Sequence, residues 1–349
     1  MNRVGPIRAL PLAAIGVAAT VAYAAVAFFA PRSAAPGLLV SFLFWSGIAV
    51  GGLAALMIHR LTGGNWGYAN ARAFELAVGA LPLVAVFAIV IFALLPALYP
   101  WSSAPAAAPD VMRWYLNSPL FIVRTCIAFA GWIVIAVALR LPGPVGQLIA
   151  ASGLVFHGLI VGVIGLDWIQ SVEPPFFSSS FGASLAFTQL LAAFAFAAIL
   201  SPPDERDCSR ADLGGLMLTM VLGLTYIDFM AFLIVWYGNL PHKVEWFVRR
   251  EALPWSAIAI AMFVLTSVVP VFLLFFARVR ASRSGLRAVG CVILAGIALY
   301  DIWLVAPAGG PASALTALFA IAAAGALLSM LAAAGLPSTL WPRLGAAHD

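Results

Sequence analysis

Charged residues are scarce in this sequence, and lysine is almost missing. Of 349 residues only 9% are charged, 18 of them basic and 13 acidic, whereas 64% are hydrophobic. An ordinary soluble domain carries roughly 25% charged residues, so this chain has too little polar surface to cover a water-soluble globule. A soluble fold is therefore excluded, and the solvent around the chain is predicted to be lipid.

Cysteine is also rare, and its spacing lacks a metal-binding pattern. The three cysteines, Cys126, Cys208 and Cys291, lie far apart, and no two of them form a CxxC motif. This spacing argues against a disulfide framework, a zinc site or an iron–sulfur cluster. The chain also has no Walker or dinucleotide-binding fingerprint placed after a strand.

Histidine is too sparse for a haem held by two axial histidines, which must both lie inside the membrane on facing helices. Only His157 maps near the middle of an apolar run. The others, at helix ends, in loops or in the tail, are His59, His242 and His348. We therefore expect this chain to bind no haem, metal or other redox cofactor of its own, which leaves redox metals to partner subunits.

Long apolar runs make up most of the chain. Ten of them reach about 20 residues, the length that crosses a ~30 Å hydrocarbon core. The sequence therefore predicts an all-α polytopic membrane protein with about ten transmembrane helices, a single membrane domain over 1–349 and both termini on one side. The predicted helices span residues 10–30, 37–61, 71–98, 119–141, 147–169, 181–200, 212–237, 255–276, 286–305 and 314–335.

The distribution of arginine predicts the orientation of these helices. Twelve basic residues lie on the side of the termini and six on the opposite side. An excess of positive charge marks the cytoplasmic side, so both termini are predicted to be cytoplasmic. The net charge of +5 and the pI of 9.4 come from these scattered arginines. They indicate topology and contact with anionic lipid, not binding to nucleic acid.

Ionisable residues inside the apolar runs are the candidates for function, because each costs a few kcal/mol unless it meets a partner or water. Arg124 and Asp167 lie at similar depth near the outer ends of the fourth and fifth helices, and we predict a buried ion pair between them. Glu75 lies one turn after Arg72, where an ion pair and a role in a proton pathway are both open. His157, ten residues before Asp167, is a further proton-pathway candidate.

Two further carboxylates have no cation one helical turn away. Asp228 on the seventh helix and Asp301 on the ninth fall in the outer half of the membrane by helical rise, near Tyr226 and Tyr300 respectively. An unpaired carboxylate in lipid either keeps its proton or lines a hydrated cavity. Both states suit proton relay or contact with a hydroxyl-bearing ligand such as quinol, so Asp228 and Asp301 are predicted to serve one of these roles.

Two aromatic-rich segments resemble motifs of one membrane family. The first reads GLDW at 165–168 and continues into SVEP at 171–174 and FFS at 176–178. It resembles the "DW…SLEPHWFS" signature of the NrfD-like membrane subunits of alternative complex III. The second reads IVWYGNLP at 234–241 and ends a helix that opens with DLG at 212–214. It is similar to the "DLG…IWYGNLPEE" segment of the ActF-type subunit of this quinol:cytochrome c oxidoreductase.

The resemblance extends over about 51–307. The chain has Thr266 and Ser267 before Pro270 where the family commonly has a histidine, and Pro175 where a histidine often follows Glu-Pro. Other positions that match the family's helices are Leu61, Thr62, Gly63, Trp66, Arg72, Glu75, Pro82, Tyr115, Leu116, Asn117, Arg124 and the segment YDIWLV at 300–305, which contains Asp301.

The resemblance implies a particular architecture. The family has a core of two four-helix bundles, which would cover 37–169 and 181–305 in this chain. One flanking helix at each end, over 10–30 and 314–335, completes the ten helices. The resemblance also implies the bacterial inner membrane as the location.

The resemblance further implies partners and a role. The chain would sit beside a homologous NrfD-like subunit, an iron–sulfur subunit and multihaem cytochromes c, with a terminal oxidase as an optional further partner. Iron–sulfur clusters and haem c would belong to these partners, and quinol is the one cofactor that the chain itself could contact. The residues implied in quinol contact or in the coupled proton pathway are Glu75, His157, Asp167, Asp228 and Asp301.

Two other functions stay open at the level of sequence. Ten helices with buried carboxylates also describe many secondary transporters. Pro82 and Pro270 interrupt two helices, as in such carriers, but the surrounding patterns do not correspond between the two halves. The other alternative is a structural anchor that holds extrinsic redox subunits and handles neither protons nor quinol. Whether the chain takes part in catalysis is therefore left open by the sequence.

Overall fold

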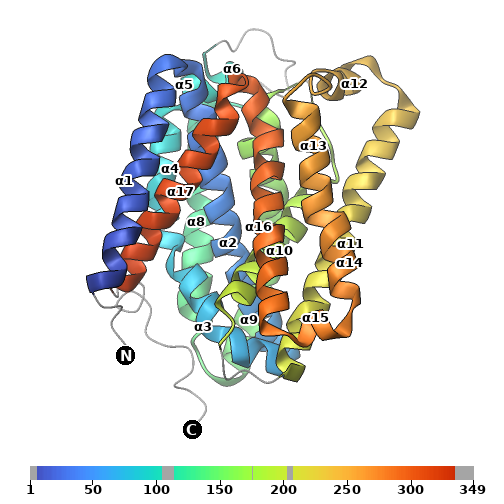
Figure 1. The fold of residues 1–349 in the computed structure, drawn as a ribbon. Helices are drawn as coiled ribbons and strands as arrows, with labels where there is room; N and C mark the ends of the chain where they lie inside the picture. Colours follow the sequence, from blue (N-terminus) through green and yellow to red (C-terminus); the bar gives the residue numbers. More distant parts are fainter. Residues whose placement is uncertain (1–5, 104–113, 175, 203–206, 335–349) are drawn as a thin grey trace.

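The computed structural model describes residues 6–103, 114–174, 176–202 and 207–334, which form one assembly of long helices (Figure 1). Ten segments are long and apolar enough to cross a membrane, and the described residues contain no strand. The predicted fold class, an all-α polytopic membrane protein, is therefore confirmed. The crossing segments are built from α1 (Pro6–Phe29), α2 (Ala34–Thr62), α3 (Asn65–Gly79) with α4 (Leu81–Ala93), α8 (Ser118–Ala138), α9 (Gly143–Ile164), α10 (Phe181–Leu200), α11 (Asp207–Gly238), α13 (Trp255–Phe263) with α14 (Val269–Phe275), α16 (Arg283–Val305) and α17 (Ala312–Ala333).

Prolines divide two of these segments. The stretch 71–98, expected as one helix, consists of the end of α3, then α4 and α5 (Leu95–Leu98), with Pro82 and Pro96 in the first turns of α4 and α5. Proline has no N–H to donate and clashes with the preceding turn, so it readily begins a helix but interrupts one that runs through it. In the eighth segment, Pro270 near the start of α14 follows the π-helical turn η5 (Val264–Val268).

The central helix is α2, which packs against α17, α10, α3 and α9. Small residues permit these close approaches. A Cβ on Gly51 would collide with the backbone carbonyl of Gln189 on α10, and one on Gly52 would press against Ala77 of α3. Glycine at such crossings lets helix backbones touch, which is how membrane helices gain packing without a hydrophobic driving force.

The first and last helices lie together at one side of the assembly (Figure 1). α1 packs along α17, and α17 packs in turn on α2. In the rest of the fold, α8 packs on α9, whereas α10 contacts α2, α11 and α16. Because α2 and α10 also pack on each other, the division into bundles over 37–169 and 181–305 stays a prediction.

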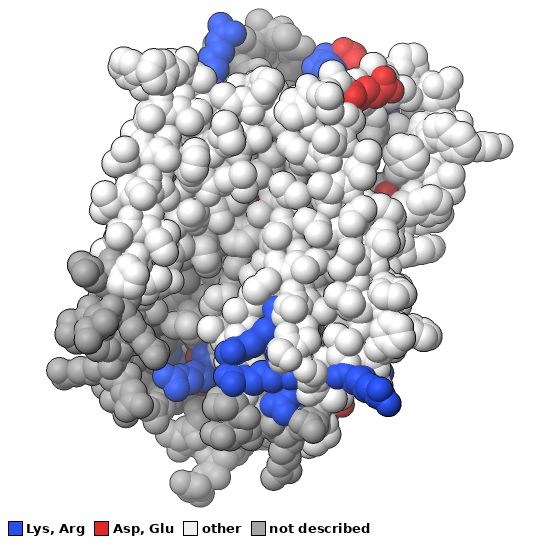
Figure 2. Space-filling model, viewed as in Figure 1, with Lys and Arg blue, Asp and Glu red and all other residues white. Residues whose placement is uncertain are grey.

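The two ends of the assembly differ in charge. We call the end where α1 begins and α17 ends the proximal end, and the end that carries α12 (Pro241–Val248) the distal end (Figure 1). Figure 2 shows a band of basic side chains near the proximal end and an almost uncharged middle. Arginines of α15 (Ala277–Ala281) and of the start of α16 lie at this end, namely Arg278, Arg280, Arg283 and Arg287. An uncharged middle between polar ends suits contact with lipid.

Candidate functional site

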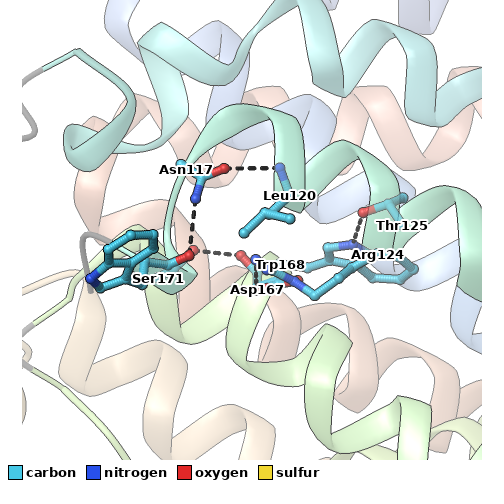
Figure 3. Close-up of polar contacts among 8 residues, drawn as sticks. Asn117, Leu120, Arg124, Thr125, Asp167, Trp168 and Ser171 are labelled. Atoms are coloured by element: carbon cyan, nitrogen blue, oxygen red, sulfur yellow. Dashed lines mark hydrogen bonds and ion pairs between the residues drawn. The ribbon is translucent and has the colours of Figure 1, made fainter. Parts of the chain in front are cut away.

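A buried ion pair joins α8 to the distal end of the fifth membrane segment. Arg124 donates from Nε and Nη2 to Oδ2 and Oδ1 of Asp167, at 2.6 and 2.9 Å (Figure 3). The side chain of Asp167 is 1% exposed and that of Arg124 is 15% exposed. The ring of Tyr115 packs on the guanidinium, 3.9 Å from its carbon. The structure thus brings together the two residues that the sequence placed at similar depth.

The π-helical turn η3 (Gly165–Ile169) positions Asp167 toward Arg124. On this turn, Trp168 Nε1 donates to Thr125 Oγ1 of α8 at 3.0 Å, and the Tyr99 hydroxyl donates to the carbonyl of Trp168 at 3.0 Å. The hydroxyl of Ser171 donates to the carbonyl of Asp167. Because these bonds hold both partners and their charges balance, the pair is built as a fixed link between helices.

Two tyrosines close to this pair are held in their neutral form. Burial raises the pKa of Tyr115 to about 12, and the negative charge of Asp167 acts in the same direction. Burial also raises the pKa of Tyr99, again with a contribution from Asp167. Both hydroxyls therefore keep their protons at neutral pH and add no charge to the site.

A second polar cluster surrounds Asp228 on α11. Ser184 Oγ of α10 donates to Asp228 Oδ1 at 2.6 Å, and the Tyr300 hydroxyl of α16 lies 3.5 Å from the same oxygen. Within the described residues, Oδ2 of Asp228 accepts no hydrogen bond and neither oxygen meets a cation. The residue is partly exposed. Asp228 is thus a carboxylate held by hydroxyl groups alone.

Asp301 follows Tyr300 on α16 and is only 4% exposed. In the described part of the chain its carboxylate has neither a hydrogen bond nor an ion pair. Tyr300 interacts electrostatically with both Asp301 and Asp228. The structure therefore brings the two predicted carboxylates to one tyrosine. Tyr226, which the sequence places beside Asp228, is 65% exposed and lies outside the cluster.

Hydroxyl groups extend the second cluster toward the middle of the membrane segment. Thr225, one turn before Asp228, donates from Oγ1 to Ser267 Oγ at 2.8 Å. Ser267 and Thr266 are buried in the π-helical turn η5, where Thr266 packs against Gly296 of α16. The π turn thus places two hydroxyl side chains beside α11 and α16.

No family model and no curated protein matches this chain. The polar clusters are therefore interpreted from their own geometry. The resemblance to NrfD-like subunits stays a prediction that rests on the motifs in the sequence.

His157 belongs to neither cluster. It is 5% exposed, and within the described residues both of its ring nitrogens are buried without a hydrogen-bond partner. The Nε1 of Trp132 is also buried without a hydrogen-bond partner among these residues. The ring centroid of Trp132 lies 6.3 Å from that of His157. By helical rise His157 lies about 15 Å from Asp167. Unsatisfied buried nitrogens of this kind are sites where an ordered water can bind.

Glu75 lies on α3 near the proximal end, away from both distal clusters. The sequence offered Arg72 as its partner, and the structure also brings Arg140, after α8, within electrostatic range of Glu75. Burial lowers the pKa of Arg140, and the attraction of Glu75 opposes that shift. Glu75 is thus associated with a cation in the turn that follows α8 and stands apart from Asp228 and Asp301.

The distal end contains a buried arginine that the sequence interpretation treated only as a loop charge. All five N–H groups of Arg250 are used, since it donates to both oxygens of Glu173, at 3.0 and 3.2 Å, and to the carbonyls of Trp246, Trp303 and Leu304. Its guanidinium carbon also lies 3.6 Å from the Trp246 ring centroid. Burial lowers the pKa of Arg250, and the bonds to Glu173 oppose that shift. Arg250 therefore links the end of η4 (Gln170–Val172) to α12 and to the end of α16.

Metal-binding geometry is missing from the described part of the chain. No three His, Cys, Asp or Glu side chains there could hold a metal ion together. The three cysteines are free. His59 Nε2 is 3.0 Å from the carbonyl of Gly64, whereas His348 and the side chain of His242 lie outside the described residues.

Proposed function

We propose that this chain is a membrane subunit of a quinol:cytochrome c oxidoreductase of the alternative complex III type, in which Asp228 and Asp301 handle protons. The observation that carries the proposal is the cluster around Tyr300, where two carboxylates lie inside membrane segments and no cation among the described residues neutralises either one. Ionisable groups inside a membrane are costly, and they are typical of proton relays and ligand sites.

The sequence motifs support the choice of complex. Asp167 and Glu173, from the segment that resembles the NrfD-like signature, each form a buried ion pair at the distal end. Asp301 belongs to the YDIWLV segment that resembles the ninth helix of the family. The motif residues thus either hold the distal end together or lie at the unneutralised cluster, as expected if both features serve one function.

The geometry of the second cluster suits proton transfer. The Ser184 hydroxyl is already bonded to Asp228 and the Tyr300 hydroxyl is near it, while Thr225, three residues before Asp228 on α11, forms a separate hydroxyl pair with Ser267. Hydroxyls and carboxylates bridged by water pass protons by exchanging hydrogen bonds. Quinol oxidation releases protons and electrons. In the proposed complex the electrons pass to iron–sulfur clusters and haem c on partner subunits.

Location and partners follow from the same proposal. The chain lies in the bacterial inner membrane with both termini cytoplasmic, so the distal end faces the periplasm. Twelve basic residues on the side of the termini against six on the other side support this orientation. The partners are a second NrfD-like subunit, an iron–sulfur subunit and multihaem cytochromes c, which contact the distal end and the lipid-facing helices.

The test is to remove the titrating groups while keeping their shape. We expect Asp228→Asn and Asp301→Asn to leave the complex assembled, and to lower quinol:cytochrome c turnover or its coupled proton release about tenfold, equivalent to about 1.4 kcal/mol. Glu245→Gln and Glu251→Gln change exposed carboxylates at the distal end and serve as matched controls.

Two outcomes would overturn the proposal. Full turnover and coupling in the Asp228→Asn, Asp301→Asn double variant would assign the chain the role of a structural anchor. Purification without any cytochrome c or iron–sulfur subunit, together with substrate uptake by vesicles that contain only this chain, would assign it to the transporters.

A further inference from the structure

A groove lies between α3 and α17 in the proximal half of the fold. Both helices pack on α2, and in Figure 1 the proximal half of α17 leans toward α1 and away from α16. The space between them is a partly open cavity of about 80 Å³, which we call the α3–α17 groove. Its floor comes from α2 and α10 and its sides from α3, α4 and α17, including Ile48, Phe196, Leu76, Ala80, Leu83 and Leu328.

Trp45 of α2 forms a fixed wall of this groove. Its Nε1 donates to the carbonyl of Ile321 on α17 at 3.1 Å. Gly325 of α17 leaves room for the indole, since a Cβ at that position would lie 2.5 Å from the ring. Ile48, one turn further along α2, is 2% exposed. The wall is therefore held in place by the protein itself, and the groove is already formed before a ligand enters it.

The lining of the groove is suited to hydrocarbon. Ser329 of α17 carries the one hydroxyl of the lining, and this side chain is exposed at the mouth of the groove. A bound water needs two to four polar partners, which an apolar lining does not supply. An empty groove would lose dispersion contacts along its walls. A lipid acyl chain satisfies both conditions.

A basic side chain lies at the proximal edge of the groove. Arg72 is one helical turn before Leu76 on the same face of α3, about 6 Å nearer to the proximal end. It is exposed, and it forms no hydrogen bond or ion pair with any of the described residues. Glu75, on the same helix, interacts electrostatically with Arg140. The edge of the groove thus presents a guanidinium that is available to an anion.

The apolar groove and the arginine together select the ligand. A neutral lipid would leave Arg72 without an anion, and a zwitterionic head group would bring a second cation beside the guanidinium. The long arginine side chain can extend from the helix to the level of the head groups. We propose that the α3–α17 groove binds an anionic phospholipid, with one acyl chain in the groove and the phosphate at Arg72. This site does not depend on the proposed function, because lipid binding requires no turnover.

Photolabelling of the full chain in lipid nanodiscs tests this inference. The probe is phosphatidylglycerol with a diazirine near the end of one acyl chain, and phosphatidylcholine with the same chain is the matched control. Labelled peptides are mapped by mass spectrometry. We expect the phosphatidylglycerol probe to label residues 76–83 and 325–332 at least about fivefold more than the control, equivalent to about 1 kcal/mol. Unlabelled phosphatidylglycerol should compete for these positions.

Three variants make the test specific. Ser329→Trp adds a ring at the exposed mouth of the groove and should lower the label in both segments at least about fivefold. Leu159→Trp adds the same ring on the surface of α9, where Leu159 is 72% exposed, and should leave the label unchanged. Arg72→Gln removes the charge at the edge of the groove and should make the labelling by the two probes equal.

Several outcomes would overturn the inference. One is label spread evenly over the lipid-facing helices, and another is label in the groove that Ser329→Trp does not lower. A preference for phosphatidylglycerol that persists in Arg72→Gln would show that this guanidinium does not bind the head group. A disulfide from a cysteine placed at position 329 to one placed in 335–349, or to a partner subunit in the intact complex, would show that protein occupies the groove.

Discussion

Arg124 meets Asp167 through two parallel hydrogen bonds, each shorter than 3.0 Å, in the buried distal region of the fold. Asp301 also lies near the distal end of its helix, but no guanidinium faces it among the described residues. One carboxylate is therefore neutralised and fixed, and the other is left without a counter-charge. This contrast separates the structural pair from the group assigned to proton handling.

Removing Asp167 alone should destabilise the protein strongly. Asp167→Ala leaves the Arg124 guanidinium buried without its anion, and breaking such a pair costs about 3–5 kcal/mol. The Arg124→Ala, Asp167→Ala double variant leaves no stranded charge and should lose less than the sum of the single losses. Unfolding by sodium dodecyl sulfate in mixed micelles measures all four corners of this cycle. Additive losses would show that the two side chains do not stabilise each other.

The isolated chain should show no b-type haem spectrum. Among the described residues His157 is the one histidine inside the apolar interior, and the ring of His59 is bonded near the proximal end to the carbonyl of Gly64. Two axial histidines on facing helices are needed for a membrane b haem, so a second ligand for His157 is lacking. The measurement is a reduced-minus-oxidised spectrum of the chain purified after expression with added haem. A b-type α band that disappears in His157→Ala would contradict this expectation.

Much of the fold could be predicted from the sequence, because the length of an apolar run that crosses lipid is set by the bilayer. All ten crossing segments coincide with predicted runs. The interruption at Pro82 was expected from the sequence, whereas the division at Leu94 and the π turns η3 and η5 could not be predicted in the same way. They depend on how a proline or a hydroxyl side chain packs against neighbouring helices, which hydropathy does not encode.

The polar clusters were only partly predictable. The pairing of Arg124 with Asp167 followed from equal depth on consecutive helices. The choice of Tyr226 as a neighbour of Asp228 failed, because residues two apart on a helix point to nearly opposite sides. Tyr300 takes that place from α16. The bond between Arg250 and Glu173 joins loops 77 residues apart, and only the folded chain brings them together.

Replacing Arg250 by lysine should lower stability much more than the same change at its neighbour Arg249. Arg250 uses five N–H donors and stacks on Trp246, whereas a lysine has three donors and no plane. We expect Arg250→Lys to cost about 2–4 kcal/mol, close to the range for breaking a buried pair. Arg249 pairs with Glu245 at the surface with both side chains more than half exposed, so Arg249→Lys should cost about 0–1 kcal/mol. Thermal unfolding of both variants in detergent makes the comparison. Equal shifts of the unfolding midpoint would show that Arg250 does not link these segments more strongly than Arg249 does.

The crossing of α2 and α10 gives the last prediction. At Gly51 a Cβ would meet the carbonyl oxygen and carbon of Gln189, which belong to a rigid helix backbone and cannot move aside as a side chain could. Gly51→Ala should therefore push the two helices apart and cost about 1–3 kcal/mol in the free energy of unfolding. Gly158 on α9 has nothing within 4 Å of the same position, so Gly158→Ala adds a methyl group in open space. That control should be neutral, or stabilising by up to about 1 kcal/mol, through its better helix propensity. Unfolding in mixed micelles compares the two variants, and a neutral Gly51→Ala would mean that α2 and α10 do not touch at this glycine.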